Sequence, residues 1–123
     1  MARYITTPTR IKSVGNKEKI IDEFIGLINS GTRSISIARM QSPSGWIEPP
    51  QTPEFTEYTL VLKGSLHVKA SDNHYVINAN EVFIAEAGET VQYSTPEEPG
   101  AEYIAVCLPA FSPDTVNRQD DES

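Results

Sequence analysis

The sequence predicts an all-β fold, a barrel or sandwich of eight or more short strands. Runs in which apolar and polar residues alternate recur along the chain, and turns rich in glycine, proline and asparagine separate them. A chain of 123 residues has the size of one domain with one core. We therefore expect a single domain over residues 1–118, with a barrel core at 34–108 and a disordered acidic tail at 119–123.

The first part of the chain allows two interpretations. Pro8 restricts residues 2–9 to an edge strand or to an arm that crosses to a second subunit. Residues 17–28, KEKIIDEFIGLI, have apolar side chains at helical spacing, but EFIGLI followed by NSGT and RSISIARM is also typical of a hairpin. We favour the hairpin, because Gly26 would weaken a helix by ~1 kcal/mol and residues 29–31 are turn formers.

The remaining strands follow from alternation and from the turns between them. We expect them at residues 33–41, 57–64, 65–70, 74–77, 81–87, 90–94 and 102–108. Gly64 suits a turn with positive φ, so we place a strand end there. Residues 45–54 contain three prolines and should form a stiff loop. Residues 110–118 include Phe111 and Val116, and we expect them to pack on the barrel or on a partner.

Composition argues against several classes of partner. The formal net charge is −7, the isoelectric point is near 4.7, and no basic stripe is present. A nucleic-acid backbone or an anionic membrane surface would require clustered Lys and Arg. No apolar run approaches the roughly 20 residues of a membrane span. The single cysteine, Cys107, cannot form an internal disulfide, and we expect a cytoplasmic protein.

The stretch from residue 45 to residue 64 has the spacing of a known motif. Its marked positions are Gly45, Gln51, Pro53, Glu57 and Gly64. In this spacing the chain resembles the first motif of the cupins, which has histidines at the second and third positions and glutamate at the fourth. A second cupin motif is matched in spacing by Asn80, Glu86, Gly88, Val91 and Thr95. Of these five, Gly88 alone keeps the residue type of the second motif.

The resemblance covers residues 34–108 and implies a jelly-roll barrel, the double-stranded β-helix, with an N-terminal arm and a packed C-terminal tail. It also implies a homodimer that pairs through its sheets. Many cupins hold a divalent metal with three histidines and a glutamate. Here Gln51, Pro53 and Val91 replace the histidines, so we expect no metal site of the usual kind. An atypical site with oxygen ligands stays open, formed from Glu48, Gln51, Glu54 and Glu57.

Strand alternation gives candidate residues for a cavity without a metal. Glu57 points inward by its motif position, and Tyr93 shares the face of Val91. We take these two as candidate catalytic residues for proton transfer, with a raised pKa at Glu57. The alternative is that Glu57 only stabilises the barrel by pairing with Arg39 or a backbone amide. Candidate ligand-binding residues are Arg39, Trp46, Glu48, Gln51 and Tyr103. Alternation on the last strand does not decide whether the face of Tyr103 or that of Ile104 lines the cavity.

Three functional hypotheses follow. The first is a protein that binds a small polar metabolite without a transition metal. The second is an isomerase, epimerase or lyase that uses Glu57 with Tyr93, or an atypical carboxylate metal site. The third is a structural dimeric subunit whose barrel is filled by side chains. We expect His67 and His74 to be surface residues and Cys107 to be a buried structural thiol.

Overall fold

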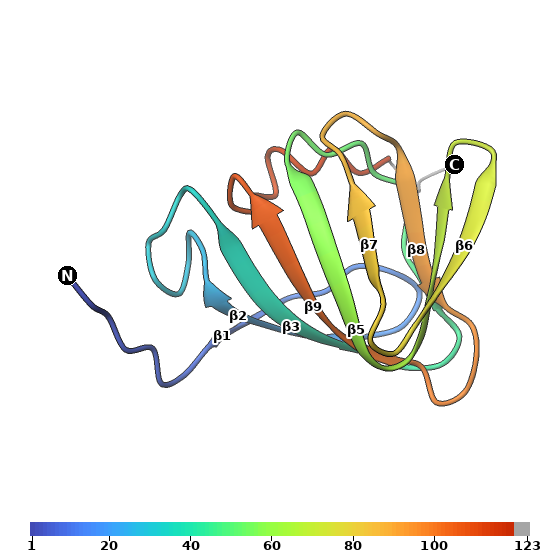
Figure 1. Cartoon of the computed structure of the whole chain (residues 1–123), viewed down its shortest axis with the longest axis horizontal. Coiled ribbons are helices and arrows are strands. Elements are labelled where there is room, and N and C mark those ends of the chain that lie inside the picture. Colours follow the sequence, from blue (N-terminus) through green and yellow to red (C-terminus); the bar gives the residue numbers. More distant parts are fainter. Residues whose placement is uncertain (120–123) are drawn as a thin grey trace.

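The computed structural model describes residues 1–119, which form an all-β barrel as predicted (Figure 1). Within these residues the structure has strands and no helix. The strands are β1 (Thr9–Ile11), β2 (Ile20–Ile25), β3 (Ser36–Ser42), β4 (Trp46–Ile47), β5 (Thr56–Ala70), β6 (Asn73–Asn78), β7 (Val82–Ala85), β8 (Val91–Thr95) and β9 (Ala101–Leu108). The order along the sheet is β1-β2-β3-β9-β5-β8-β4, and β6 and β7 also pair with β5.

Strand β5 runs through both halves of the barrel. Up to Gly64 it pairs with β7 and β9, and beyond Gly64 it pairs with β6 and β8. Gly64 has a φ of +74°, and a Cβ atom there would collide with the carbonyl oxygen of Gly100. The predicted strand end at Gly64 is therefore wrong, because this glycine bends a continuous strand instead of ending it.

The N-terminal strands extend the sheet beyond the expected core. Strand β2 pairs antiparallel with β3, and β1 pairs antiparallel with β2, so the hairpin and not the helix is present. The buried carboxylate of Glu23 holds the turn between β2 and β3. It accepts hydrogen bonds from the backbone N–H groups of Ile28 and Asn29, both at 2.9 Å. A side-chain acceptor thus replaces the ladder partners that the turn lacks.

Two apolar clusters stabilise the barrel. The larger cluster is built around fully buried side chains, among them Trp46, Val61, Leu66, Val68 and Val91. The smaller cluster joins Phe55, Cys107 and Val116, with Phe111 packed edge-on against Phe55 at a centroid distance of 5.8 Å. Burying a phenylalanine of this kind contributes roughly 2–3 kcal/mol. Residues 110–118 therefore pack back on the barrel.

The end of the described chain is held by backbone contacts. The N–H of Gln119 donates to the carbonyl oxygen of Pro50 at 2.8 Å, so Gln119 does not belong to a free tail. The rest of the expected tail, residues 120–123, lies outside the described residues. Over residues 1–119, the structure contains no helix that is long and apolar enough to cross a membrane.

Candidate functional site

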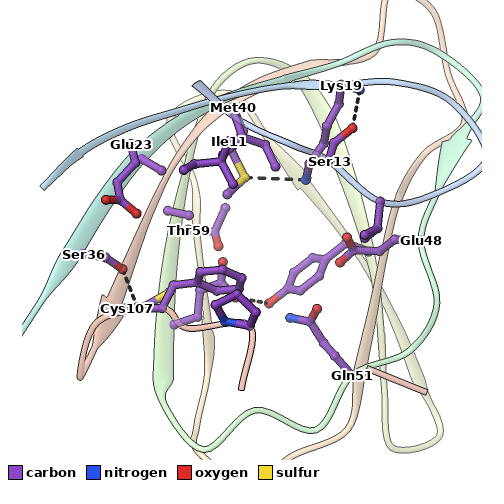
Figure 2. A pocket seen from close by; sticks show the side chains of 18 of the residues that line it. Ile11, Ser13, Lys19, Glu23, Ser36, Met40, Glu48, Gln51, Thr59 and Cys107 are labelled. Carbon is purple, nitrogen blue, oxygen red and sulfur yellow. Dashed lines mark hydrogen bonds between the residues drawn. The ribbon is translucent and has the colours of Figure 1, made fainter. Parts of the chain in front are cut away.

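The barrel encloses a cavity of about 430 Å³. Its walls come from β2, β3, β5, β8 and β9, and residues 11–19, 48–55 and 111–118 complete them (Figure 2). Lys12, Val14 and Pro113 line the cavity and are exposed at its rim. This volume lies within the range of small-molecule sites. The third hypothesis assumed a filled barrel, whereas this barrel contains a cavity.

The small and polar faces of β3 and β9 point into the cavity. These faces carry Ser36, Ala38 and Met40 on β3, and Tyr103, Ala105 and Cys107 on β9. The opposite faces, which include Ile37 and Ile104, point outward. The question left open for the last strand is thereby answered, and Tyr103 belongs to the cavity wall.

Glu57 on β5 and Tyr93 on β8 meet inside the cavity. The Tyr93 hydroxyl donates to Glu57 Oε1 over 3.4 Å, and both side chains are buried. Burial raises the pKa of Glu57 to about 7, and the nearby Glu48 adds to this, although Lys19, Tyr93 and Arg118 act in the opposite direction. Burial and the charge of Glu57 raise the pKa of Tyr93 well above its usual range. Near neutral pH, Glu57 can thus take up or release a proton.

Lys19 is a buried cation that the sequence analysis did not identify. It lies at the end of a loop that closes the barrel between β1 and β2. Asn16 anchors this loop, because its side chain donates to the carbonyl oxygen of Gly45 and accepts from the N–H of Ile47, both at 2.9 Å. Such an anchor fixes the point at which the lysine enters the cavity. Figure 2 shows the Lys19 side chain pointing inward toward Met40.

The ammonium group of Lys19 is surrounded by aromatic and hydroxyl groups. Its Nζ donates to the Tyr103 hydroxyl at 3.1 Å and lies 4.1 Å from the centre of the Trp46 ring. Burial alone lowers the pKa of Lys19, but Tyr103, Glu48 and Glu57 outweigh this effect and raise it above its ordinary value. Lys19 therefore stays charged inside the barrel.

Glu48 and Gln51 are brought to the cavity by the stiff proline-containing loop, as predicted. Gln51 exchanges two backbone hydrogen bonds with Val91, both at 2.8 Å, and these bonds attach the loop to β8. Burial raises the pKa of Glu48, and the charges of Lys19 and Arg118 offset only part of this effect. In Figure 2, Glu48 and Gln51 enter the cavity from one side and Thr59 enters from the other.

Arg118 is a second cavity cation outside the predicted site. It forms a bridge with Gln51 through the backbone, and its guanidinium lies 5.8 Å from the centre of the Phe111 ring. The packed C-terminal segment thus contributes both an aromatic wall and a positive charge to the cavity. The only signal in the sequence was the apolar character of residues 110–118, which predicted packing but not a role in a site.

Three polar atoms of the cavity lining are buried without a hydrogen-bond partner among residues 1–119. They are Gln51 Oε1, Thr59 Oγ1 and Arg118 Nε. Thr59 is 1% exposed and Gln51 is 4% exposed. Buried polar atoms are nearly always hydrogen-bonded in native proteins, because an unpaired one costs about 1–3 kcal/mol. All three atoms belong to residues that line the same cavity.

Two predicted ligand-binding residues do not line the cavity. Arg39 lies on the outer face of β3, where its guanidinium pairs with Glu102, because the apolar face of this strand points outward. Trp46 lies behind Lys19, and its Nε1 donates to the carbonyl oxygen of Val14 at 3.1 Å. The pairing of Glu57 with Arg39 that we considered is therefore absent from the described chain.

The comparisons with known proteins bear mainly on the fold. No family model matches the chain. A curated relative from Myxococcus xanthus (strain DK1622), named Endoribonuclease YbeY, is 39% identical over 101 residues, which are 82% of this chain and 34% of that protein. The chain thus spans about a third of the length of this relative.

Two solved structures share the arrangement of the barrel. The polyketide cyclase RemF from Streptomyces resistomycificus is 18% identical, with a TM-score of 0.77, and the match covers 99% of this chain and 89% of that one. The cupin domain of Schizosaccharomyces pombe Cnp3 is 11% identical, with a TM-score of 0.65, and the match covers 79% of this chain and 69% of that one. The fold is that of a cupin.

The usual metal site of a cupin does not fit the residues present in this one. The side chains of Pro53 and Val91 have no donor atom, and Val91 belongs to the apolar cluster. Over residues 1–119, no group of three or more His, Cys, Asp or Glu side chains is arranged to hold a metal ion. An oxygen-rich site would also have to coexist with the ammonium group of Lys19, which repels a divalent cation. Glu54 takes no part in it, since its carboxylate accepts from Asn117 at the surface.

His67 and His74 lie apart from the cavity, and Cys107 lines it without being activated. Glu23 also lines the cavity, but its carboxylate accepts hydrogen bonds from backbone N–H groups. His67 Nδ1 lies 2.9 Å from His74 Nε2 on the outside of the barrel, and His67 Nε2 lies 3.5 Å from a carboxylate oxygen of Glu97. Cys107 lines the cavity, but burial and the charge of Glu57 raise the pKa of its thiol, so it is not a prepared nucleophile.

Proposed function

We propose that this cupin binds a small polar organic molecule in its barrel. The observation that supports this most directly is the convergence of Gln51 Oε1, Thr59 Oγ1 and Arg118 Nε on one cavity, each without a hydrogen-bond partner in residues 1–119. A bound molecule with hydrogen-bonding groups would satisfy all three. The volume of about 430 Å³ and the apolar wall around Phe55 and Phe111 suit a molecule of metabolite size.

Replacing Thr59 by valine tests this proposal. The variant keeps the volume of the side chain and removes a hydroxyl group that has no partner in the described chain. The free protein should therefore keep its stability or gain a little, whereas ligand-induced shifts in melting temperature should shrink. The measurement is a thermal-shift screen of small acids, amino acids, amino alcohols and sugars, followed by calorimetric titration of the hits.

Thr95→Val is the matched control. Thr95 is as deeply buried as Thr59, but its hydroxyl donates to the carbonyl oxygen of Pro43 at 2.7 Å outside the cavity. This variant should lose about 1–3 kcal/mol of stability and keep its ligand affinity. If no compound shifts the melting temperature, or if the two variants weaken binding equally, the cavity is not the binding site.

A second candidate function is proton transfer by Glu57 with Tyr93. The observation in its favour is a buried carboxyl group with a pKa of about 7 that accepts a hydrogen bond from a buried tyrosine. In an isomerisation, the Glu57 carboxylate would take a proton from a carbon next to a carbonyl group. The protonated Glu57 would then return the proton to another atom of the substrate. If the Tyr93 hydroxyl gives the proton instead, Glu57 passes its own proton to Tyr93 across their hydrogen bond, so no co-reactant is needed.

Solvent deuterium uptake distinguishes a catalyst from a binding protein. A ligand found in the thermal-shift screen should exchange its acidic C–H hydrogen with D₂O in the presence of the protein. Glu57→Gln should abolish this exchange while still binding the ligand. Binding without exchange in the wild-type protein would leave the binding function alone.

We also propose that two copies pair through the outer face of the sheet. Apolar side chains face each other in a row across four strands there, in the order Ile84, Tyr58, Val106 and Ile37. The next row joins Val82, Leu60 and Ile104, and Ile84 and Val82 are about half exposed. Monomers rarely leave such a continuous apolar area uncovered, and a second copy would bury it.

Ile84→Lys should dissociate this dimer in sedimentation or light-scattering measurements. Val76→Lys, a similarly exposed position on β6, is the control and should leave the dimer intact. A wild-type protein that is monomeric, or an Ile84→Lys variant that stays dimeric, contradicts the interface.

The activity named for the Myxococcus relative belongs to that whole protein, of which this chain matches about a third. The net charge of −7 and the enclosed cavity support a small molecule in preference to RNA. The single cysteine supports the cytoplasm as the proposed compartment. The packing of residues 110–118 on the barrel supports treating residues 1–118 as one domain.

A further inference from the structure

We propose that the ligand is a small carboxylic acid that also carries a hydroxyl or amino group. Its carboxylate would lie between Lys19 and Arg118, and its hydrogen-bond donor group would face Glu48 and Gln51. This inference rests on the proposed binding function and adds the chemical class of the ligand. Four of the charged side chains that line the cavity come from four separate segments. These are Lys19, Arg118, Glu48 and Glu57.

The two cations have no direct anionic partner in the described chain. Lys19 Nζ contacts only neutral groups, the Tyr103 hydroxyl, the Met40 sulfur and the Trp46 ring. Within residues 1–119, no carboxylate oxygen lies within 4.0 Å of Lys19 or Arg118. Charges inside a protein are normally paired, because an unpaired one is costly to desolvate. A carboxylate in the cavity would supply the missing pairing and accept from Arg118 Nε.

Acceptors lie beside the cations, since Gln51 is the backbone bridge partner of Arg118. Gln51 Oε1 has no donor within residues 1–119, and no described side chain donates to the carboxyl group of Glu48. A hydroxyl or ammonium group on the ligand would serve both. The same molecule thus needs a carboxylate and a hydrogen-bond donor group. A neutral sugar lacks the carboxylate, and a simple fatty acid lacks the donor group.

Part of the remaining lining is apolar and would contact the side group of the ligand. Phe55 and Phe111 form an edge-to-face pair at one wall, and Ile11, Ile21 and Ala105 are also lining residues. A hydrocarbon or aromatic side group would fit there. The wall therefore favours an apolar amino acid or its hydroxy analogue over a small diacid.

Matched sets of compounds test the class of ligand. Each set contains an amino acid, its 2-hydroxy analogue, the acid without the donor group and the amine without the carboxylate, with side groups from alanine to phenylalanine. In at least one set, the first two should bind at least about tenfold more tightly than the last two in calorimetry. Equal affinity for all members of every set, or binding of neutral sugars alone, overturns the proposed class of hydroxy or amino acids but leaves the binding function intact. Absence of binding by any compound, sugars included, overturns both.

Arg118→Gln checks the position of the carboxylate. It should lower the affinity of the carboxylate-bearing compounds at least about tenfold and leave the affinity of the amine unchanged. Arg39→Gln, on the outer wall, is the control and should change neither. If Arg118→Gln weakens all compounds equally, Arg118 only shapes the wall, and its pairing with the ligand is wrong.

Discussion

Lys19 Nζ lies 4.1 Å from the centre of the Trp46 ring, which places a cation against an aromatic face inside the barrel. A desolvated contact of this kind is worth about 2 kcal/mol. Lys19 also lowers the pKa of Glu48 and Glu57, so its charge affects how easily these two carboxyl groups ionise. The residue thus links the packing of the barrel to the protonation of its cavity.

Lys19→Met should raise the pKa of Glu57 above its value of about 7. The reason is that the variant removes a positive charge that favours the carboxylate form. The side-chain carboxyl signals of the glutamates, followed by NMR as the pH rises, would measure the change. Lys17→Met is the control, because the Lys17 ammonium contacts the surface carbonyl of Ser44. An unchanged titration in Lys19→Met would contradict the electrostatic link.

Glu57 should make the stability of the fold depend on pH. Its pKa is about 7 in the folded protein, against an ordinary value of 4.5. Between these two pH values, Glu57 keeps a proton in the folded state that it releases in the unfolded state. The resulting stabilisation is complete below about pH 4.5 and is lost as the pH rises through about 7. Relative to Glu57→Gln, the wild-type protein should lose roughly 3 kcal/mol over this window.

Urea unfolding of the two proteins at a series of pH values would measure this loss. Glu54→Gln, which changes a surface carboxylate, should follow the wild-type curve. Parallel curves for the wild-type protein and Glu57→Gln would show that Glu57 titrates normally.

Gly64→Ala and Gly31→Ala separate backbone strain from steric collision. Both glycines have positive φ, +74° at Gly64 and +69° at Gly31, so alanine costs roughly 1 kcal/mol at either position. A Cβ atom at Gly31 meets nothing within 4 Å, whereas one at Gly64 would collide with the Gly100 carbonyl. Gly64→Ala should therefore destabilise the fold by several kcal/mol more in urea unfolding. Equal losses would mean that the bend at Gly64 can relax.

Cys107 should react slowly with thiol reagents in the native protein at about pH 8. Burial raises the pKa of its thiol, so little thiolate is present. Denaturant should restore fast labelling of one thiol per chain, since Cys107 is the single cysteine. Rapid labelling of the native protein, measured by absorbance, would identify it as an accessible nucleophile.

Much of the fold was predictable because alternation and turn residues act locally. The expected strands match β3 and β5–β9 apart from their ends, and the preference for a hairpin at residues 17–28 is confirmed. Gly64 was misassigned since a positive φ allows both a turn and a bend in a continuous strand. The sequence does not distinguish them without knowledge of which strands pair on either side.

Residues of the candidate site could be predicted only where motif spacing, the alternation of side chains along a strand, or the stiff loop indicated their position. Glu57 and Gln51 were found from motif spacing and Tyr93 from strand alternation, and Glu48 from its place in the stiff loop. All four line the cavity. Arg39 was misplaced because we assumed that apolar residues face inward, whereas this interior is a partly polar cavity and the apolar face of β3 lies outside. Lys19 and Arg118 come from segments outside both motifs, and tertiary packing alone brings them to the site.

The passage of β5 through both halves has a consequence for exchange with solvent. Because β5 belongs to both halves of the barrel, the halves can separate only if β5 loses its hydrogen bonds to neighbouring strands. Amides in β5 should therefore exchange only through global unfolding, while those in residues 12–18 should exchange through small local openings. A ligand would then enter and leave the barrel through movements of its loops, and the residence time of the bound ligand would depend on the loops and not on the strands.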